Sequence, residues 1–148
     1  MVKIGDFIKG NLNFNGFQSR NDHYGLVVYK ELFPTGYNLY VVPMSKHNKP
    51  TDKTLPVKSY EVTGNIDFSH ERNSDPYLRD SKNNKIPHYS RLKLEHMNMI
   101  KVYYNNGSPI IRCNSKGQPN VYGKYKNKDV LGKFVEHFKN KLNVKEVA

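Results

Sequence analysis

The 148-residue sequence has one cysteine, no tryptophan and no long apolar run. The single cysteine, Cys113, excludes an intrachain disulfide framework and a zinc cluster built on cysteines. No apolar run approaches the ~20 residues that span a bilayer, so no membrane partner is expected. The N-terminal residues lack the apolar stretch of a secretory signal, which predicts a cytoplasmic location. A glycine-rich phosphate loop is also missing, which excludes nucleotide hydrolysis of the P-loop type.

Acidic residues are scarce relative to basic ones. Lys and Arg number 24 against 13 Asp and Glu, which gives a formal net charge of +11. This excess favours a polyanionic partner, namely RNA, DNA, an acidic protein or an anionic membrane surface. The 11 Tyr and 7 Phe argue against a disordered chain, and the length fits one domain over residues 1–148. The histidines lack metal-ligand spacing, so neither a metal nor another cofactor is expected.

Short apolar runs between turn residues predict an α+β fold that is mainly β. Residues 24–29 and 37–44 are apolar on both faces, and we expect them to pair as a central hairpin with its turn at 33–36. Near the end of the chain, apolar residues at helical spacing predict a C-terminal helix over 127–143, with Asn127 or Asp129 as its cap.

Three polar stretches are predicted to be loops. Residues 13–23 are rich in Asn and Gly, and residues 45–58 contain four lysines and two prolines. Residues 64–86 are polar over a longer distance and predict a long loop or insertion.

The chemistry-bearing residues gather where the second predicted hairpin strand ends. A hydroxyl, two ammonium groups and an imidazole follow there, in Ser45, Lys46, His47 and Lys49. Antiparallel pairing of the two strands would bring the start of the first strand beside this cluster. We therefore expect His23 and Arg20 to approach Ser45 and Lys46.

This set of groups suits metal-independent RNA cleavage, which needs a base, an acid and donors to the phosphoryl oxygens. His23 is the natural acid or base because an unperturbed imidazole titrates near pH ~6.5. Lys46 and Arg20 would bind phosphate, and Ser45 would donate to a non-bridging oxygen. Plainer interpretations stay open, because such a histidine is often an ordinary surface group and such a serine often a turn residue.

Four short motifs, taken in order, resemble the PemK/MazF-type toxin endoribonucleases, including the ToxN/AbiQ-like group. They are Gly5-Asp6, the HYGLVV run at 23–28, the VVPMS run at 41–45 and the SRLKLEH run at 90–96. The sequence departs from the family pattern in several places. His23 stands where the family usually has Arg, Lys46 follows Ser45 without the proline of a Ser-Pro-Lys motif, and His96 replaces a Gln.

The resemblance implies an SH3-like barrel with a C-terminal helix, and a homodimer. It implies a toxin of a toxin–antitoxin system that cleaves single-stranded RNA by 2′-OH transesterification and is neutralised by a protein or RNA antitoxin. Ser45 would be the active-site hydroxyl, with His23 or Arg20 as its basic partner. The predicted RNA-binding residues are Lys49, His47, Ser90, Arg91 and Phe17.

Two other functions remain open at the level of sequence. Residues 112–148 hold nine basic and three acidic side chains, so positive charge extends beyond the expected active site. That spread suits a non-catalytic RNA- or DNA-binding module on the same barrel. A basic interaction protein with an acidic protein partner is the third candidate.

Overall fold

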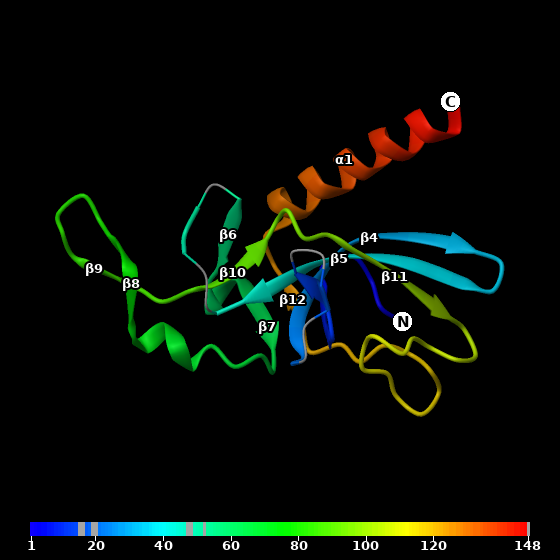
Figure 1. Ribbon diagram of the computed structural model, residues 1–148, viewed down its shortest axis with the longest axis horizontal. Coiled ribbons are helices and arrows are strands. Elements are labelled where there is room, and N and C mark those ends of the chain that lie inside the picture. Colours follow the sequence, from blue (N-terminus) through cyan, green and yellow to red (C-terminus); the bar gives the residue numbers. More distant parts are fainter. Residues whose placement is uncertain (15–16, 19–20, 47–48, 52, 148) are drawn as a thin grey trace.

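The protein is described by a computed structural model covering residues 1–14, 17–18, 21–46, 49–51 and 53–147. Within these residues the fold is mainly β, with a single α-helix at the C-terminal end (Figure 1). The strands are β1 (Asp6–Gly10), β2 (Asn13–Phe14), β3 (Phe17–Gln18), β4 (His23–Phe33), β5 (Gly36–Ser45), β6 (Thr54–Val57), β7 (Val62–Gly64), β8 (Ser74–Arg79), β9 (Lys85–Pro87), β10 (Ser90–Lys93), β11 (Asn98–Tyr103) and β12 (Gly123–Tyr125). The helices are the 3-10 turns η1 (Ser59–Glu61) and η2 (Ser69–Arg72) and the α-helix α1 (Lys128–Val147).

Eight strands form one antiparallel, nearly closed, barrel-like sheet. Its order is β6-β10-β5-β4-β1-β12-β7, and β11 also pairs with β5. The predicted central hairpin is confirmed, because β4 pairs with β5 from Phe33 opposite Gly36 to Gly25 opposite Pro43. The prediction of a mainly β fold with a C-terminal helix is therefore confirmed.

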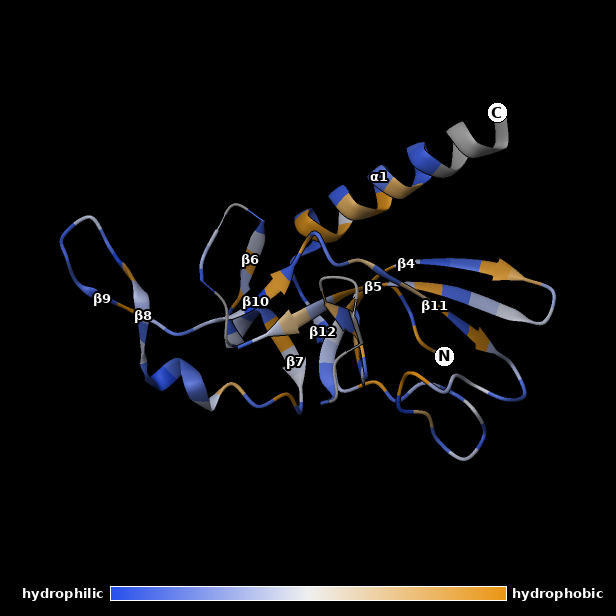
Figure 2. Cartoon of the chain, viewed as in Figure 1, coloured by the Kyte–Doolittle hydropathy of each residue, from blue (hydrophilic) through white to orange (hydrophobic). Residues whose placement is uncertain are grey.

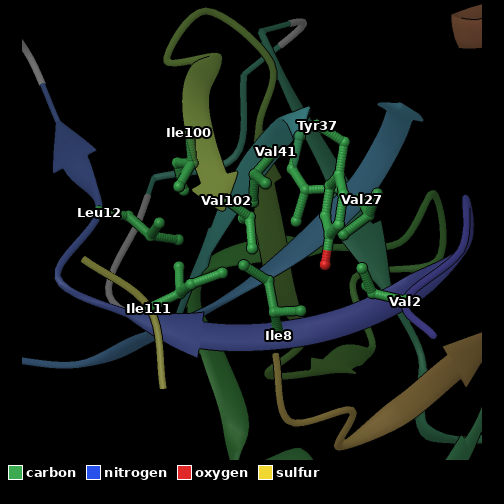
Figure 3. Packing of buried hydrophobic residues seen from close by; sticks show 10 residues of the cluster. Val2, Ile8, Leu12, Val27, Tyr37, Val41, Ile100, Val102 and Ile111 are labelled. Carbon is green, nitrogen blue, oxygen red and sulfur yellow. The ribbon is translucent and has the colours of Figure 1, made fainter. Parts of the chain in front are cut away.

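The central strands bury apolar side chains on both faces. Successive residues of a strand point to opposite faces, so Val27 and Val41 enter one cluster while Leu26 and Val42 enter the other. Figure 3 shows the first cluster, in which the strands β1, β4, β5 and β11 all contribute side chains around Ile8. The second cluster includes Leu92 of β10 and Leu131 and Phe138 of α1, a helix along which hydrophobic and hydrophilic residues alternate in Figure 2. Two cores explain why these strands are apolar on both faces over residues 26–28 and 41–42.

Helix α1 begins at its predicted cap. The side-chain oxygen of Asn127 accepts a hydrogen bond from the Val130 N–H at 3.2 Å. Leu131 and Phe138 are buried, and the Phe138 ring stacks on Tyr29 of β4 at 5.4 Å. The helix extends past its predicted end, to Val147. No helix among the described residues combines the length and apolarity needed to cross a membrane.

The three predicted loops contain regular structure. Residues 64–86 hold η2 and most of the β8–β9 pair, which extends from the sheet as an arm at the left of Figure 1. The basic stretch 45–58 contains β6, and 13–23 contains β2 and β3. Strand β6 was not predicted because it contains Pro56, and proline disfavours a central strand. Here β6 pairs only with β10 and forms an edge, where the missing N–H is tolerated.

Candidate active site

A pocket of about 440 Å³ opens where four strands of the sheet meet. Lys9 of β1 and Tyr24 of β4 form part of its wall. The rest of the wall comes from the ends of β4, β5 and β10 and from neighbouring loops, through Asn21, Asp22, His23, Met44, Ser45, Lys46, Asp67 and Ser90. The pocket thus brings together His23, Ser45, Lys46 and Ser90 from the predicted site.

Strand register explains why His23 and Ser45 share this pocket. Gly25 of β4 lies opposite Pro43 of β5. Because the strands are antiparallel, the residue two positions before Gly25 on β4 faces the residue two positions after Pro43 on β5. These two residues are His23 and Ser45. On its other side, Ser45 lies opposite Arg91 of β10, which brings the adjacent Ser90 to the same end of the sheet.

The imidazole of His23 is fixed by two contacts. Its Nδ1 lies 3.0 Å from the backbone carbonyl oxygen of Asn21, and its ring lies 4.7 Å from the Phe14 ring in an edge-to-face arrangement. A carbonyl oxygen only accepts hydrogen bonds, so Nδ1 carries the hydrogen in this contact. In the neutral ring the lone pair is then on Nε2, the form in which an imidazole acts as a general base.

Ser90 is held by a second histidine that comes from the arm side of the pocket. Ser90 is buried, and its hydroxyl lies 2.8 Å from Nε2 of His70. The other nitrogen, Nδ1, is buried without a hydrogen-bond partner among the described residues. Burial lowers the pKa of His70, and the positive charges of Lys46 and His88 lower it further. His70 is therefore held in its neutral form beside Ser90.

His88 secures the chain segment that follows β5. Its Nε2 lies 2.6 Å from the carbonyl oxygen of Lys46, to which it donates. The rings of His70 and His88 meet edge to face at 5.6 Å. Residues on either side of the β8–β9 pair thus fix a hydroxyl and a backbone segment of the pocket.

The charges around the pocket are mixed. Lys9 and Lys46 contribute two ammonium groups, and Lys9 also lies 4.9 Å from the centre of the Tyr24 ring. The carboxylate of Asp22 accepts a hydrogen bond from Nε of Arg112 and so is already paired. A hydrogen bond from the Ser69 N–H at 2.9 Å lowers the pKa of Asp67, which keeps that carboxyl ionised.

The other predicted site residues lie elsewhere or are not described. Arg20 and His47 fall outside the described residues, and Phe17 lies on β3 opposite Phe14. Lys49 is exposed, with its ammonium group 5.6 Å from the centre of the Tyr77 ring.

Arg91, which is predicted to bind RNA, lies between β10 and β6. It is only 8 % exposed, and its Nε donates to the hydroxyl of Thr54 at 2.8 Å. Because side chains alternate along β10, Arg91 points away from the pocket that Ser90 lines. The guanidinium therefore ties β10 to β6.

Three residues at the pocket were missed by the sequence analysis. His70 and His88 flank a polar segment, and the sequence holds no signal that this segment folds back on the strand end. Lys9 was within reach of sequence reasoning, because pairing of β1 with β4 sets it opposite Tyr24. Among the described residues, no group of three His, Cys, Asp or Glu side chains is arranged to hold a metal ion.

Comparison with known proteins gave no relative. No family model matches the chain, and neither a curated protein nor a solved structure does. Function therefore has to be argued from the pocket itself.

Proposed function

We propose that the protein is a metal-independent endoribonuclease of the PemK/MazF type, which cleaves single-stranded RNA by attack of a 2′-OH on the neighbouring phosphate. The observation that carries the proposal is the shared pocket of His23, Ser45, Lys46 and Ser90. It supplies a base, two hydroxyl donors and a cation within one cavity, as this reaction requires.

Each group has a role set by its chemistry. Nε2 of His23 takes the proton of the 2′-OH as the bond from the 2′-oxygen to phosphorus forms. The bond from phosphorus to the 5′-oxygen breaks, and that oxygen leaves with a proton from the ammonium group of Lys46. The hydroxyls of Ser45 and Ser90 donate to the non-bridging oxygens, where negative charge increases in the transition state. The products are a 2′,3′-cyclic phosphate and a free 5′-OH.

The test is incubation of the purified protein with a long single-stranded RNA in EDTA. We expect discrete fragments that end in 2′,3′-cyclic phosphate, and no cleavage of DNA of the same sequence, because DNA lacks the nucleophile. His23→Ala is expected to lower kcat at least ~10²-fold, the usual scale for a general base. Ser45→Ala is expected to lower kcat by about 10²-fold, as for loss of one donor to a developing oxyanion.

Lys101→Ala serves as the matched control, because Lys101 is exposed on β11 and lines no pocket described here. It removes one positive charge and is expected to leave cleavage within twofold of the wild type. Unchanged cleavage in both His23→Ala and Ser45→Ala would refute the assignment of the active site. Circular dichroism of each variant checks that the fold is retained.

A non-catalytic nucleic-acid-binding module is the second candidate. The basic residues of α1, such as Lys128, Lys133 and Lys139, are exposed and lie outside the pocket lining. Salt-dependent RNA binding with no fragments in EDTA would favour this function.

The family proposal extends to the fold type and the partners. We propose that the barrel-like sheet is of the SH3-like kind and that the protein forms a homodimer. An antitoxin, protein or RNA, would then act by filling the pocket. Loss of cleavage on adding the antitoxin, at a stoichiometry fixed by native mass spectrometry, tests these proposals.

A further inference from the structure

A second, smaller pocket lies beside the candidate active site and carries a concentrated positive charge. Its volume is about 300 Å³, and three of its wall residues are Lys49, Lys53 and Lys93. Thr51, Thr54 and His96 complete most of the wall. The Thr54 hydroxyl donates to the Thr51 carbonyl oxygen at 3.1 Å, so the ammonium groups are the donors that this pocket offers to a phosphate.

Among the described residues, one acidic side chain lines this pocket, and it is already engaged. Glu95 lines the wall and pairs with the ammonium group of Lys53 at 3.1 Å. Lys93 is half-buried and lies opposite Thr54 across the β10–β6 ladder, so the strands fix its position. Among the described residues that line the pocket, Lys49 and Lys93 therefore leave a net positive charge.

Phe14 links this pocket to the candidate active site. Its ring lies 4.7 Å from that of His23, which lines the first pocket. The same ring lies 6.4 Å from that of His96, which lines the second pocket. The two imidazoles are therefore separated by one phenyl ring.

We propose that the pocket of Lys49, Lys53 and Lys93 binds a second phosphate of the same RNA strand whose scissile phosphate lies at His23 and Ser45. This inference rests on the proposed function for the identity of the strand. The second pocket is predicted to raise the affinity for RNA whether or not the RNA is cleaved. It would also set the minimum length of a substrate that binds tightly.

The test uses RNA that binds and is not cleaved. Full 2′-O-methylation blocks the nucleophile, so affinity is measured for a 2′-O-methyl hexamer and for a dimer with one phosphate. Lys93→Ala removes one charge-assisted phosphate contact, so this variant is expected to bind the hexamer about tenfold more weakly than the wild type. The slope of log affinity against log salt is expected to fall by about 0.7, the value for one phosphate contact on a single strand.

The dimer provides the internal control. The single phosphate of the dimer occupies one pocket at a time, and Lys93→Ala leaves the first pocket available. The affinity of the protein for the dimer is therefore expected to change by less than about twofold. Lys101→Ala provides the charge-matched control and is expected to change hexamer affinity by less than about twofold.

Each result decides the inference. A hexamer affinity that falls no further in Lys93→Ala than in Lys101→Ala overturns it, as does an equal loss for dimer and hexamer or no hexamer binding by the wild type. If the expected losses are found but unmodified RNA is not cleaved, the second site stands and the proposed catalysis fails. If unmodified RNA is cleaved, Lys93→Ala is expected to raise KM about tenfold for a ribohexamer at unchanged kcat.

Discussion

His70 lies beside the candidate active site, in an environment that changes the pKa of its imidazole. Its ring is held against Ser90 and faces two positive groups, Lys46 and His88, and two negative ones, Asp67 and Glu71. Burial and the positive groups together lower its pKa. Protonation of His70 therefore opposes folding.

This environment predicts a pH dependence of stability. Since the pKa of His70 is lower in the folded state, the unfolded chain binds more protons as the pH falls through the usual value of ~6.5. The stability contributed by neutral His70 is thus present above that pH and is lost below it. His70→Gln keeps a donor at a similar position but does not titrate.

The measurement is the free energy of unfolding of both proteins in urea between pH 8 and pH 5. The free energy of unfolding of the wild type, relative to that of His70→Gln, is expected to decrease as the pH falls. Parallel curves across this range would contradict the burial of a neutral imidazole.

Tyr37 offers a second test at the residue scale. It is 1 % exposed, and its hydroxyl has no hydrogen-bond partner among the described residues. Burial raises its pKa to about 12. Removing an unsatisfied buried hydroxyl relieves a desolvation cost, so Tyr37→Phe is expected to stabilise the protein by about 1 kcal/mol.

Tyr40→Phe is the matched control for that measurement. The Tyr40 hydroxyl lies 3.5 Å from the carboxylate of Glu31, so the substitution is expected to cost about 0.5 kcal/mol. Urea unfolding reports both values. A Tyr37→Phe protein less stable than the Tyr40→Phe protein would show that the Tyr37 hydroxyl is satisfied in solution.

At the scale of elements, the close packing of β4 against β5 and Leu12, which precedes β2, sets the position of His23. Gly25 lies two residues after His23, and a Cβ atom there would come within 2.4 Å of Val41 Cγ1 and 2.7 Å of Leu12 Cδ1. Both side chains are fully buried, so little room exists for them to move. The close approach of the strands therefore requires glycine.

Gly25→Ala is expected to lower the free energy of unfolding by about 1–3 kcal/mol through overpacking. Gly132→Ala is the control, because nothing lies within 4 Å of the added methyl group on α1. There the alanine is expected to stabilise the helix by about 0.5–1 kcal/mol. Thermal unfolding measures both changes. Unfolding midpoints that shift in the same direction from the wild-type value in both variants would contradict this packing.

The elements also show which parts of the fold are predictable from sequence. The hairpin of β4 and β5 carries a strong local signal, because two apolar β-branched runs flank a Pro-Thr-Gly turn. Helix α1 is equally well marked by its cap and apolar stripe. The hairpin signal alone sufficed to predict that His23 and Ser45 approach each other.

The arm could not be predicted in the same way. Its strands β8 and β9 have mixed, mostly exposed side chains, so neither shows the alternation that marks a half-buried strand. Its ends are placed by long-range contacts of His70 with Ser90 and of His88 with Lys46. Such contacts join residues that are 20 and 42 positions apart, and one sequence alone holds no record of them.

At the scale of the whole molecule, the net charge of +11 and the shape of the pocket act on different properties. In the proposed function, the charge would attract any nucleic acid, single- or double-stranded, because the phosphate backbone dominates affinity. The pocket would be selective, since Ser90, one of its wall residues, is only 1 % exposed. A nucleotide reaches that depth only when it is free to leave its stack.

This separation predicts that the protein binds duplex RNA and does not cut it. Bases in an A-form duplex are stacked, and the phosphates follow a fixed helical path, whereas an unpaired strand adapts to a recessed site. One RNA is incubated with the protein alone and after annealing to its complement, while binding is followed by fluorescence anisotropy at the same salt concentration. We expect comparable binding and at least tenfold slower cleavage of the duplex. Equal cleavage of both forms would mean that the reacting phosphate is bound at the surface, where Lys46 and the exposed lysines would then have to supply the chemistry assigned here to the pocket.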